Sequence, residues 1–192
     1  ARAHDGLALA CRSDPAAGSN AGRSYVLVGR AGTTATDLSA IAAGTGGFVI
    51  NGQCAGDYSG RSVAGAGDVN GDGLTDLIVG VAFNSHITGG VWAGRSYVVF
   101  GKTGTAALDL SAVAAGTRGF VINSHSEYDA SGCSVASAGD VNGDGLSDLI
   151  VGAVSSGGTG RSYVVFGKTG TSAVDLSAVA AGSGGFVRSG EG

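Results

Sequence analysis

The chain has 192 residues, a formal net charge of -4, and 38 glycines but only 1 proline. Its hydrophobic content is 43% and is gathered in short runs, which excludes a flexible low-complexity polymer and predicts a folded chain. The negative charge, without a basic cluster, argues against nucleic acid as a partner. No apolar run approaches the roughly 18 residues that span a bilayer.

The start of the chain, ARAHDGLALA, has neither the basic beginning nor the apolar stretch of a signal peptide. The chain also begins without methionine. We therefore expect a mature or excised piece of a longer protein.

Short apolar runs recur along the chain and are rich in Val, Ile, Tyr and Phe. In chain order they are SYVLVG, GFVI, SVAGAG, LIVG, SYVVFG and GFV. Gly, Asn, Asp or Ser bounds each run, which is typical of β-strands. Helical periodicity is nearly absent, and the best helical candidate, LSAVAAGT, ends in glycine after one or two turns. We therefore predict an all-β fold.

Three signatures recur with one spacing. GRSY begins at Gly22, Gly94 and Gly160, DLSA begins at Asp37, Asp109 and Asp175, and GFV begins at Gly47, Gly119 and Gly185. Each series steps by 72 and then by 66 residues. The difference falls in one segment, residues 80–94 compared with residues 152–160, which we interpret as a surface loop of variable length.

One repeat predicts four short antiparallel strands, SVAGAG, DLIVGV, RSYVVFG and GFVIN, with the DVNGDG loop after the first strand and DLSAVAAG before the last. Periodic four-stranded units of this kind are typical of β-propeller blades. The small residues of SVAGAG suit the innermost strand, where blades crowd together. We predict a partial first blade over 1–52, a second blade over 53–124 and a third over 125–192.

The first repeat lacks the inner strand and the acidic loop. In the register that we favour, Asp5, Gly6 and Leu7 are a remnant of the acidic loop and LALAC replaces LIVGV. In the alternative register, GLALACRSD aligns with GRSVAGAGD. We favour the first because SDPAAGSNAGRSY then corresponds to the variable loop before the third strand.

The sequence DVNGDGLTD at 68–76 is repeated as DVNGDGLSD at 140–148, with oxygen-bearing side chains at loop positions 1, 3, 5 and 9. Ca²⁺ takes six to eight oxygen ligands at about 2.3–2.6 Å, and alternating positions on a tight loop direct oxygens toward one centre. The carbonyl at position 7 would add a further ligand. The predicted Ca²⁺ ligands are Asp68, Asn70, Asp72, Leu74 and Asp76 in one loop and Asp140, Asn142, Asp144, Leu146 and Asp148 in the other.

Two other structures share part of this pattern. An EF-hand needs Glu at position 12 and flanking helices, whereas position 12 here is Val79 or Val151 in an apolar run. A metal-free hairpin turn is also built from Asp, Asn and Gly. However, three carboxylates within nine residues, written twice, would then repel one another without a counter-ion. The sequence therefore predicts two calcium sites, each closing a β-hairpin.

The segments SGRSVAGAGDVNGDGLTDLIVGVA (59–82) and SGCSVASAGDVNGDGLSDLIVGAV (131–154) resemble the FG-GAP repeat of the integrin α-subunit β-propeller and its bacterial relatives. The family's calcium loop matches at every ligand position, with Asn at the second. The name-giving ends differ, because Ser-Gly stands for Phe-Gly, and Gly-Val-Ala or Gly-Ala-Val stands for Gly-Ala-Pro. The family usually closes seven blades, whereas this chain has fewer than three complete ones.

The resemblance implies a calcium-binding, non-enzymatic module of an extracellular or cell-surface protein, with an adhesive or protein-binding role. An incomplete stack of blades exposes a sheet face at each end. We therefore expect either self-association of copies into a closed ring or the missing blades in a longer parent chain. The alternatives are an accessory propeller domain of a secreted hydrolase and a purely structural self-assembling repeat.

The other chemistry-bearing residues are interpreted as structural. The cysteines, at unrelated spacings, match neither a disulfide framework nor a zinc site, and the histidines are scattered. Neither a G-x-S-x-G nor an H-E-x-x-H motif occurs. The cysteines are Cys11, Cys54 and Cys133, and the histidines are His4, His86 and His125. The recurring Arg23, Arg95 and Arg161 are interpreted as partners of Asp37, Asp109 and Asp175, with a ligand groove as the alternative. The variable loop over 83–93, which contains Trp92, is where we expect ligand contact.

Overall fold

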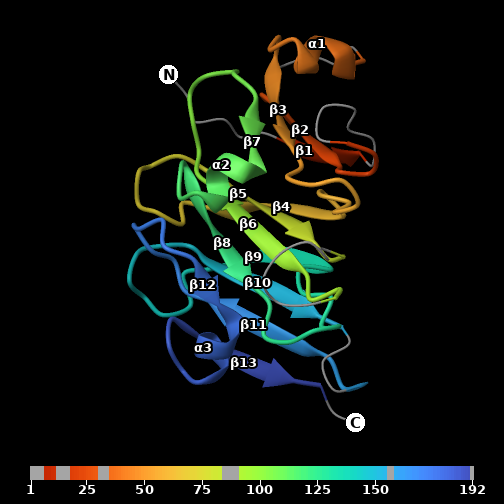
Figure 1. Cartoon of the computed structure of the whole chain (residues 1–192). Helices are drawn as coiled ribbons and strands as arrows, with labels where there is room; N and C mark the ends of the chain where they lie inside the picture. Colours follow the sequence, from red (N-terminus) through yellow and green to blue (C-terminus); the bar gives the residue numbers. More distant parts are fainter. Residues whose placement is uncertain (1–6, 12–17, 30–34, 84–90, 155–157, 191–192) are drawn as a thin grey trace.

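The computed structural model describes residues 7–11, 18–29, 35–83, 91–154 and 158–190, and the side chains of all of these except 7–11. Its three sheets follow one another along the molecule in chain order (Figure 1). The all-β prediction is confirmed, because antiparallel sheets account for the core and the described helices are five residues long. None of these helices is long enough to cross a membrane.

The first two sheets each include a short strand from the following repeat, and the third sheet does not. The first contains β1 (Leu7–Cys11), β2 (Arg23–Leu27), β3 (Gly47–Asn51) and β7 (Leu108–Asp109). The second contains β4 (Ser62–Gly67), β5 (Asp76–Val81), β6 (Arg95–Val99), β8 (Gly119–Asn123) and β12 (Val174–Asp175). The third contains β9 (Ser134–Gly139), β10 (Asp148–Ala153), β11 (Arg161–Val165) and β13 (Gly185–Ser189). The helices are α1 (Leu38–Ala42), α2 (Leu110–Ala114) and α3 (Leu176–Ala180).

The second sheet is covered on both faces, which explains why β5 is apolar after its first residue. All six residues of β5 are buried. Leu77 and Val79 belong to the core shared with the first sheet, whereas Ile78 belongs to the core shared with the third. Alternate side chains of a strand point to opposite faces, so a strand between two sheets needs apolar residues throughout.

Two apolar cores join the three sheets. The core between the first and second sheets consists of Val26, Phe48, Ile50, Leu77, Val79, Val81, Tyr97, Val99, Leu108, Leu110, Val113 and Val121. The core between the second and third sheets consists of Ala66, Val69, Ile78, Val98, Phe120, Ile122, Leu149, Val151, Ala153, Tyr163, Val165, Leu176 and Val179. Burial of each large side chain contributes about 1.5–3 kcal/mol, so these seams are the main stabilising feature.

A hydrogen-bonded clamp also connects neighbouring blades. β7 pairs in parallel with β3 of the preceding blade, and β12 pairs in the same way with β8. At the ends of these pairings, Asn51 Nδ2 donates to Asp109 Oδ1 at 2.7 Å and Asn123 Nδ2 donates to Asp175 Oδ1 at 2.8 Å. The partners of these two recurring aspartates are therefore asparagines, and the prediction that they pair with the recurring arginines is wrong.

Asp37 occupies the same repeat position in the first blade but has a different role. Its carboxylate accepts a hydrogen bond from Ser39 N at 2.8 Å and caps α1. Asp109 and Asp175 form no side-chain cap on their helices. Asp37 therefore caps the helix of its own repeat. In the described part of the chain, no earlier blade precedes it to provide an asparagine partner.

The register of β1 identifies its place in the first blade. Leu7 pairs with Leu27 and Cys11 with Arg23, just as Leu77 pairs with Val99 in the second blade. Residues 7–11 therefore occupy the position of β5, as in the register that we favoured. In the described part of the chain, β1 is the edge of its sheet, where an inner strand like β4 would lie. Asp5 and Gly6 lie outside the described residues.

Candidate metal sites

The two acidic loops connect the inner pair of strands in the second and third blades. At the exit of each loop the pairing shifts by one residue: Gly67 lies opposite Asp76, while Gly65 lies opposite Leu77. The same shift separates Asp148 and Leu149 in the third blade. Such a bulge increases the local twist and redirects the residue at loop position 9.

The first aspartate of each loop binds backbone amides of the turn. Asp68 Oδ1 accepts hydrogen bonds from Gly71 N at 2.8 Å and Asp72 N at 3.0 Å, and Asp68 Oδ2 accepts from Gly73 N at 2.8 Å. Gly71 and Gly73 have φ of 79° and 80°, a conformation that glycine adopts without steric cost. Asp140 forms the same three bonds in the second loop. The loop therefore wraps around this carboxylate.

Positions 3 and 5 add oxygens to the same side of the loop. The amide of Asp72 donates both to Asp68 Oδ1 and, at 2.9 Å, to Asn70 Oδ1, which brings these two oxygens together. Asn70 Nδ2 donates to Asp72 Oδ2 at 3.0 Å. Leu74, the predicted carbonyl ligand, donates its own amide to Asp72 Oδ1 at 2.8 Å. The matching bonds of the other loop join Asn142, Asp144 and Leu146.

The aspartate at position 9 is fully buried and connects the loop to a neighbouring strand. Asp76 Oδ2 accepts from Val69 N at 2.8 Å, and its Oδ1 accepts from Gly101 N at 2.7 Å. Asp148 accepts from Val141 N at 2.9 Å and from Gly167 N at 2.8 Å. The position that was predicted as a metal ligand therefore also fixes the loop to the end of the third strand.

Burial raises the pKa of Asp76 to about 6. Its hydrogen bonds from Gly101 and Val69 oppose this rise, and the nearby charges of Asp72 and Asp68 add to it. The carboxylates of Asp68 and Asp72 are therefore close enough to disfavour the charged form of Asp76. A bound cation would remove that repulsion.

Among the described residues, no three acidic, His or Cys side chains converge as a ready-made metal site. The side chains at positions 1, 3 and 5 gather on the loop, whereas that of position 9 points to buried amides. The donor set nevertheless consists of carboxylate and amide oxygens, which hard cations such as Ca²⁺ prefer. A carboxylate has about four lone-pair sites, more than these hydrogen bonds use. The residues therefore fit calcium by their chemistry.

The third blade supports the first loop through contacts that the sequence did not reveal. Ser147 N donates to the carbonyl of Asp68, and Lys168 N donates to that of Val69, each at 2.9 Å. Val69 is 0% exposed, whereas its counterpart Val141 is 51% exposed. The two loops share a sequence but not an environment.

Trp92, expected at a ligand surface, belongs to a row of aromatic rings. Tyr58, Phe83, Trp92 and Tyr128 make successive edge-to-face contacts with centroids 6.5, 6.3 and 6.4 Å apart. The Arg61 guanidinium lies 4.7 Å from the ring centroid of Phe83. The two tyrosines were not singled out from the sequence, and they occupy different repeat positions, because Tyr58 aligns with Ala130 and Tyr128 aligns with Gly56. Residues 84–90 of the variable loop lie outside the described residues.

The remaining candidate residues are dispersed. Each recurring arginine contacts its own blade: Arg23 donates to Asn51, Arg95 lies over the ring of Tyr97, and Arg161 donates to Tyr163. These contacts favour the structural interpretation of the three arginines. Cys54 and Cys133 are free and partly buried, and His125 is also partly buried. The side chains of Cys11, His4 and His86 lie outside the described residues.

Comparison with known proteins supports the reading of the repeats. The FG-GAP repeat family matches residues 59–99 and 134–165. The chain is 32% identical over 120 residues to integrin alpha-PS2 of Drosophila melanogaster, covering 61% of this chain and 8% of that protein. It is 34% identical over 122 residues to integrin alpha-3 of Cricetulus griseus, covering 64% of this chain and 11% of that protein. The chain thus contains FG-GAP repeats folded as β-propeller blades and is similar in sequence to integrin α subunits.

Proposed function

We propose that this chain is a calcium-binding, non-enzymatic propeller module that serves in protein binding or adhesion at an extracellular or cell surface. The observation that carries the proposal is the pair of acidic loops. Both loops have the same set of oxygen donors and lie at equivalent positions in the second and third blades. The adhesive role and the extracellular location are suggested by the similarity to integrin α subunits.

Calcium binding is supported by the excess of negative charge within each loop. The carboxylate at position 9 is buried against backbone amides, and two further carboxylates lie on the same short turn. Loss of a cation would leave this repulsion to be offset by hydrogen bonds alone. Bound calcium would instead lock the hairpin between the two inner strands and stabilise the blade.

The partner that we propose first is further propeller sequence, supplied by a second copy or by a longer parent chain. On the outer face of the third sheet, Ile150 is 36% exposed and Phe186 is 39% exposed. Their counterparts in the second sheet, Ile78 and Phe120, are 0% exposed beneath the third blade. An apolar sheet face of this kind favours a further blade as its cover.

Equilibrium dialysis against Ca²⁺, combined with thermal melting in calcium and in EDTA, tests the calcium proposal. We expect two ions per chain and a lower Tm in EDTA, because calcium at about 100 times its Kd adds about 2.7 kcal/mol to the native state. The double variant Asp72→Asn with Asp144→Asn keeps an oxygen acceptor at each position and should lose most of this gain. Glu127→Gln, at an exposed residue outside both loops, is the control for removal of a surface carboxylate.

A chain that binds no calcium and melts at one temperature in both buffers would show that the loops are metal-free turns. Mass measurement under native conditions tests the partner separately. We expect oligomers of the isolated chain at micromolar concentration, and a stable monomer would leave the longer parent chain as the source of the missing blades.

A further inference from the structure

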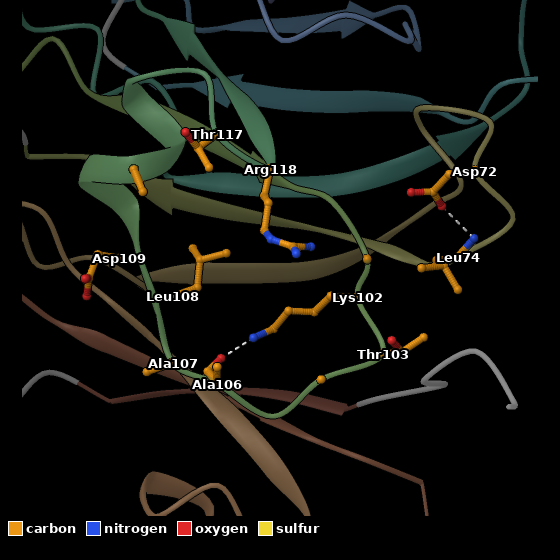
Figure 2. Close-up of a pocket in the computed structure, with 13 residues that line it drawn as sticks. Asp72, Leu74, Lys102, Thr103, Ala106, Ala107, Leu108, Asp109, Thr117 and Arg118 are labelled. Carbon is orange, nitrogen blue, oxygen red and sulfur yellow. Dashed lines mark hydrogen bonds between the residues drawn. The ribbon is translucent and has the colours of Figure 1, made fainter.

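A cavity of about 540 Å³ lies beside the first acidic loop, at the end of the second blade. The segment after β6, the short strand β7, one residue of α2 and the turn before β8 line it (Figure 2). Its polar side chains are those of Asp72, Lys102, Thr103, Asp109, Thr117 and Arg118. The two cations, Lys102 and Arg118, belong neither to the acidic loops nor to the clamp between blades.

Arg118 stands where the other repeats carry glycine. Its φ is 59°, and the equivalent Gly46 and Gly184 have φ of 78° and 70°. A residue with a Cβ is disfavoured in this left-handed conformation, and glycine is not. The second blade therefore keeps an arginine at a position where its backbone favours glycine, and strain of this kind gathers at functional sites.

The guanidinium of Arg118 forms no hydrogen bond or ion pair within the described residues. It faces Lys102 across the cavity (Figure 2). The Lys102 ammonium donates to the carbonyl of Ala106 and lies 4.0 Å from the ring centroid of Phe48. Burial, and to a smaller extent the charge of Arg118, lowers the pKa of Lys102. Two like charges thus share one cavity.

The two carboxylates that line the cavity are engaged elsewhere. Asp109 Oδ1 accepts from Asn51 in the clamp between blades. Asp72 accepts from Leu74 N and Asn70 Nδ2 within the acidic loop. The hydroxyls of Thr103 and Thr117, which also line the cavity, are additional hydrogen-bond donors.

We propose that this cavity binds an oxyanion, such as the phosphate, sulfate or carboxylate group of a ligand, between the Arg118 guanidinium and the Lys102 ammonium. The planar guanidinium presents parallel N–H donors to two oxygens, and the ammonium supplies a point charge. Binding relieves the repulsion between the two cations. Neither cation is a predicted metal ligand, although Asp72 and Leu74 of the first acidic loop line the same cavity.

The third blade provides an internal control. Lys168 matches Lys102: its ammonium lies 4.8 Å from the ring centroid of Phe120 and donates to Ser172 Oγ at 3.0 Å. Gly184 stands in place of the arginine, however. The lysine and its aromatic contact are therefore shared architecture, and Arg118 is what distinguishes the second blade.

Calorimetric titration of the whole chain, freed of calcium by prior dialysis and measured without chelator at constant ionic strength, tests the proposal with inorganic sulfate, inorganic phosphate and acetate as separate probes. We expect one saturable anion per chain, with affinity reduced about tenfold or more in Arg118→Gly and in Lys102→Gln, and unchanged in Lys168→Gln. A preference for sulfate and phosphate identifies a tetrahedral ligand group, and a preference for acetate identifies a carboxylate.

Arg118→Gly is expected to fold, because the sister repeats already use glycine there, and its Tm should equal or exceed that of the parent chain. Absence of saturable binding, equal affinity in Arg118→Gly, or an equal loss in Lys168→Gln would each overturn the proposal. A lower Tm for Arg118→Gly would also overturn it, since the arginine would then be a structural residue. Because calcium is absent throughout, failure here is separable from failure of the calcium sites.

Discussion

The second and third blades have nearly the same sequence and the same strand order, but only the second is enclosed. Phe120 is 0% exposed and Phe186 is 39% exposed, although both occupy the same position in GFV. The comparison shows that the repeat specifies the shape of a blade, while the neighbouring blade supplies the burial that stabilises it. The same residue therefore contributes differently to the free energy of unfolding in the second blade and in the third.

The largest expected difference between the two blades is the effect of truncating this phenylalanine. Phe120→Ala leaves a cavity in the closed core and should destabilise the chain by about 3–5 kcal/mol, whereas Phe186→Ala should cost much less because its ring is partly hydrated. Urea denaturation of both variants measures the difference. Equal losses would mean that the outer face of the third blade is covered in solution.

A smaller effect is expected from exchanging the residue before β8 or β13. Gly184→Arg places a side chain at φ 70°, so we expect a loss of about 1–2 kcal/mol in the third blade. Open space around Gly184 means that steric clash adds nothing to this cost. Gly170→Arg, at a neighbouring glycine with no φ in the disfavoured range and equally open surroundings, is the control. If Gly184→Arg and Gly170→Arg have the same Tm, backbone strain before the last strand does not distinguish the second blade from the third.

The smallest effect concerns the clamp between blades. Asn123→Ala removes the hydrogen bond to Asp175 and should destabilise the chain by about 1 kcal/mol. Ser189 holds the same position in the third blade, where no following repeat is present in the described chain. Ser189→Ala should therefore leave the free energy of unfolding unchanged, and a comparable loss there would contradict the role given to the clamp.

The strands and the loops were predictable because their signals are local. Apolar runs between turn residues located the strands, and the spacing of the repeats located the blades. The register of residues 7–11 also followed from the sequence, because the segment before GRSY had to be a loop.

The cavity and the clamp were not predictable, since each depends on contacts between distant segments. Asn51 and Asp109 are far apart in the chain, and only the parallel pairing of β3 with β7 brings them together. Arg118 was not singled out from the sequence, because its φ and its position opposite Lys102 depend on the fold. The aromatic row around Trp92 likewise joins residues of three separate loops.

The pairing of β7 with β3, and of β12 with β8, has a consequence for where this molecule can be divided. The outer edge of one blade is completed by two residues that belong to the next copy of the sequence motif. A fragment cut at the end of GFVIN would lose that edge, whereas a fragment extended past the next DLSA would retain it. The boundaries of the sequence repeat and the boundaries of a complete blade therefore do not coincide. A complete blade extends past the end of its own repeat, through the linker, to the short strand of the next repeat.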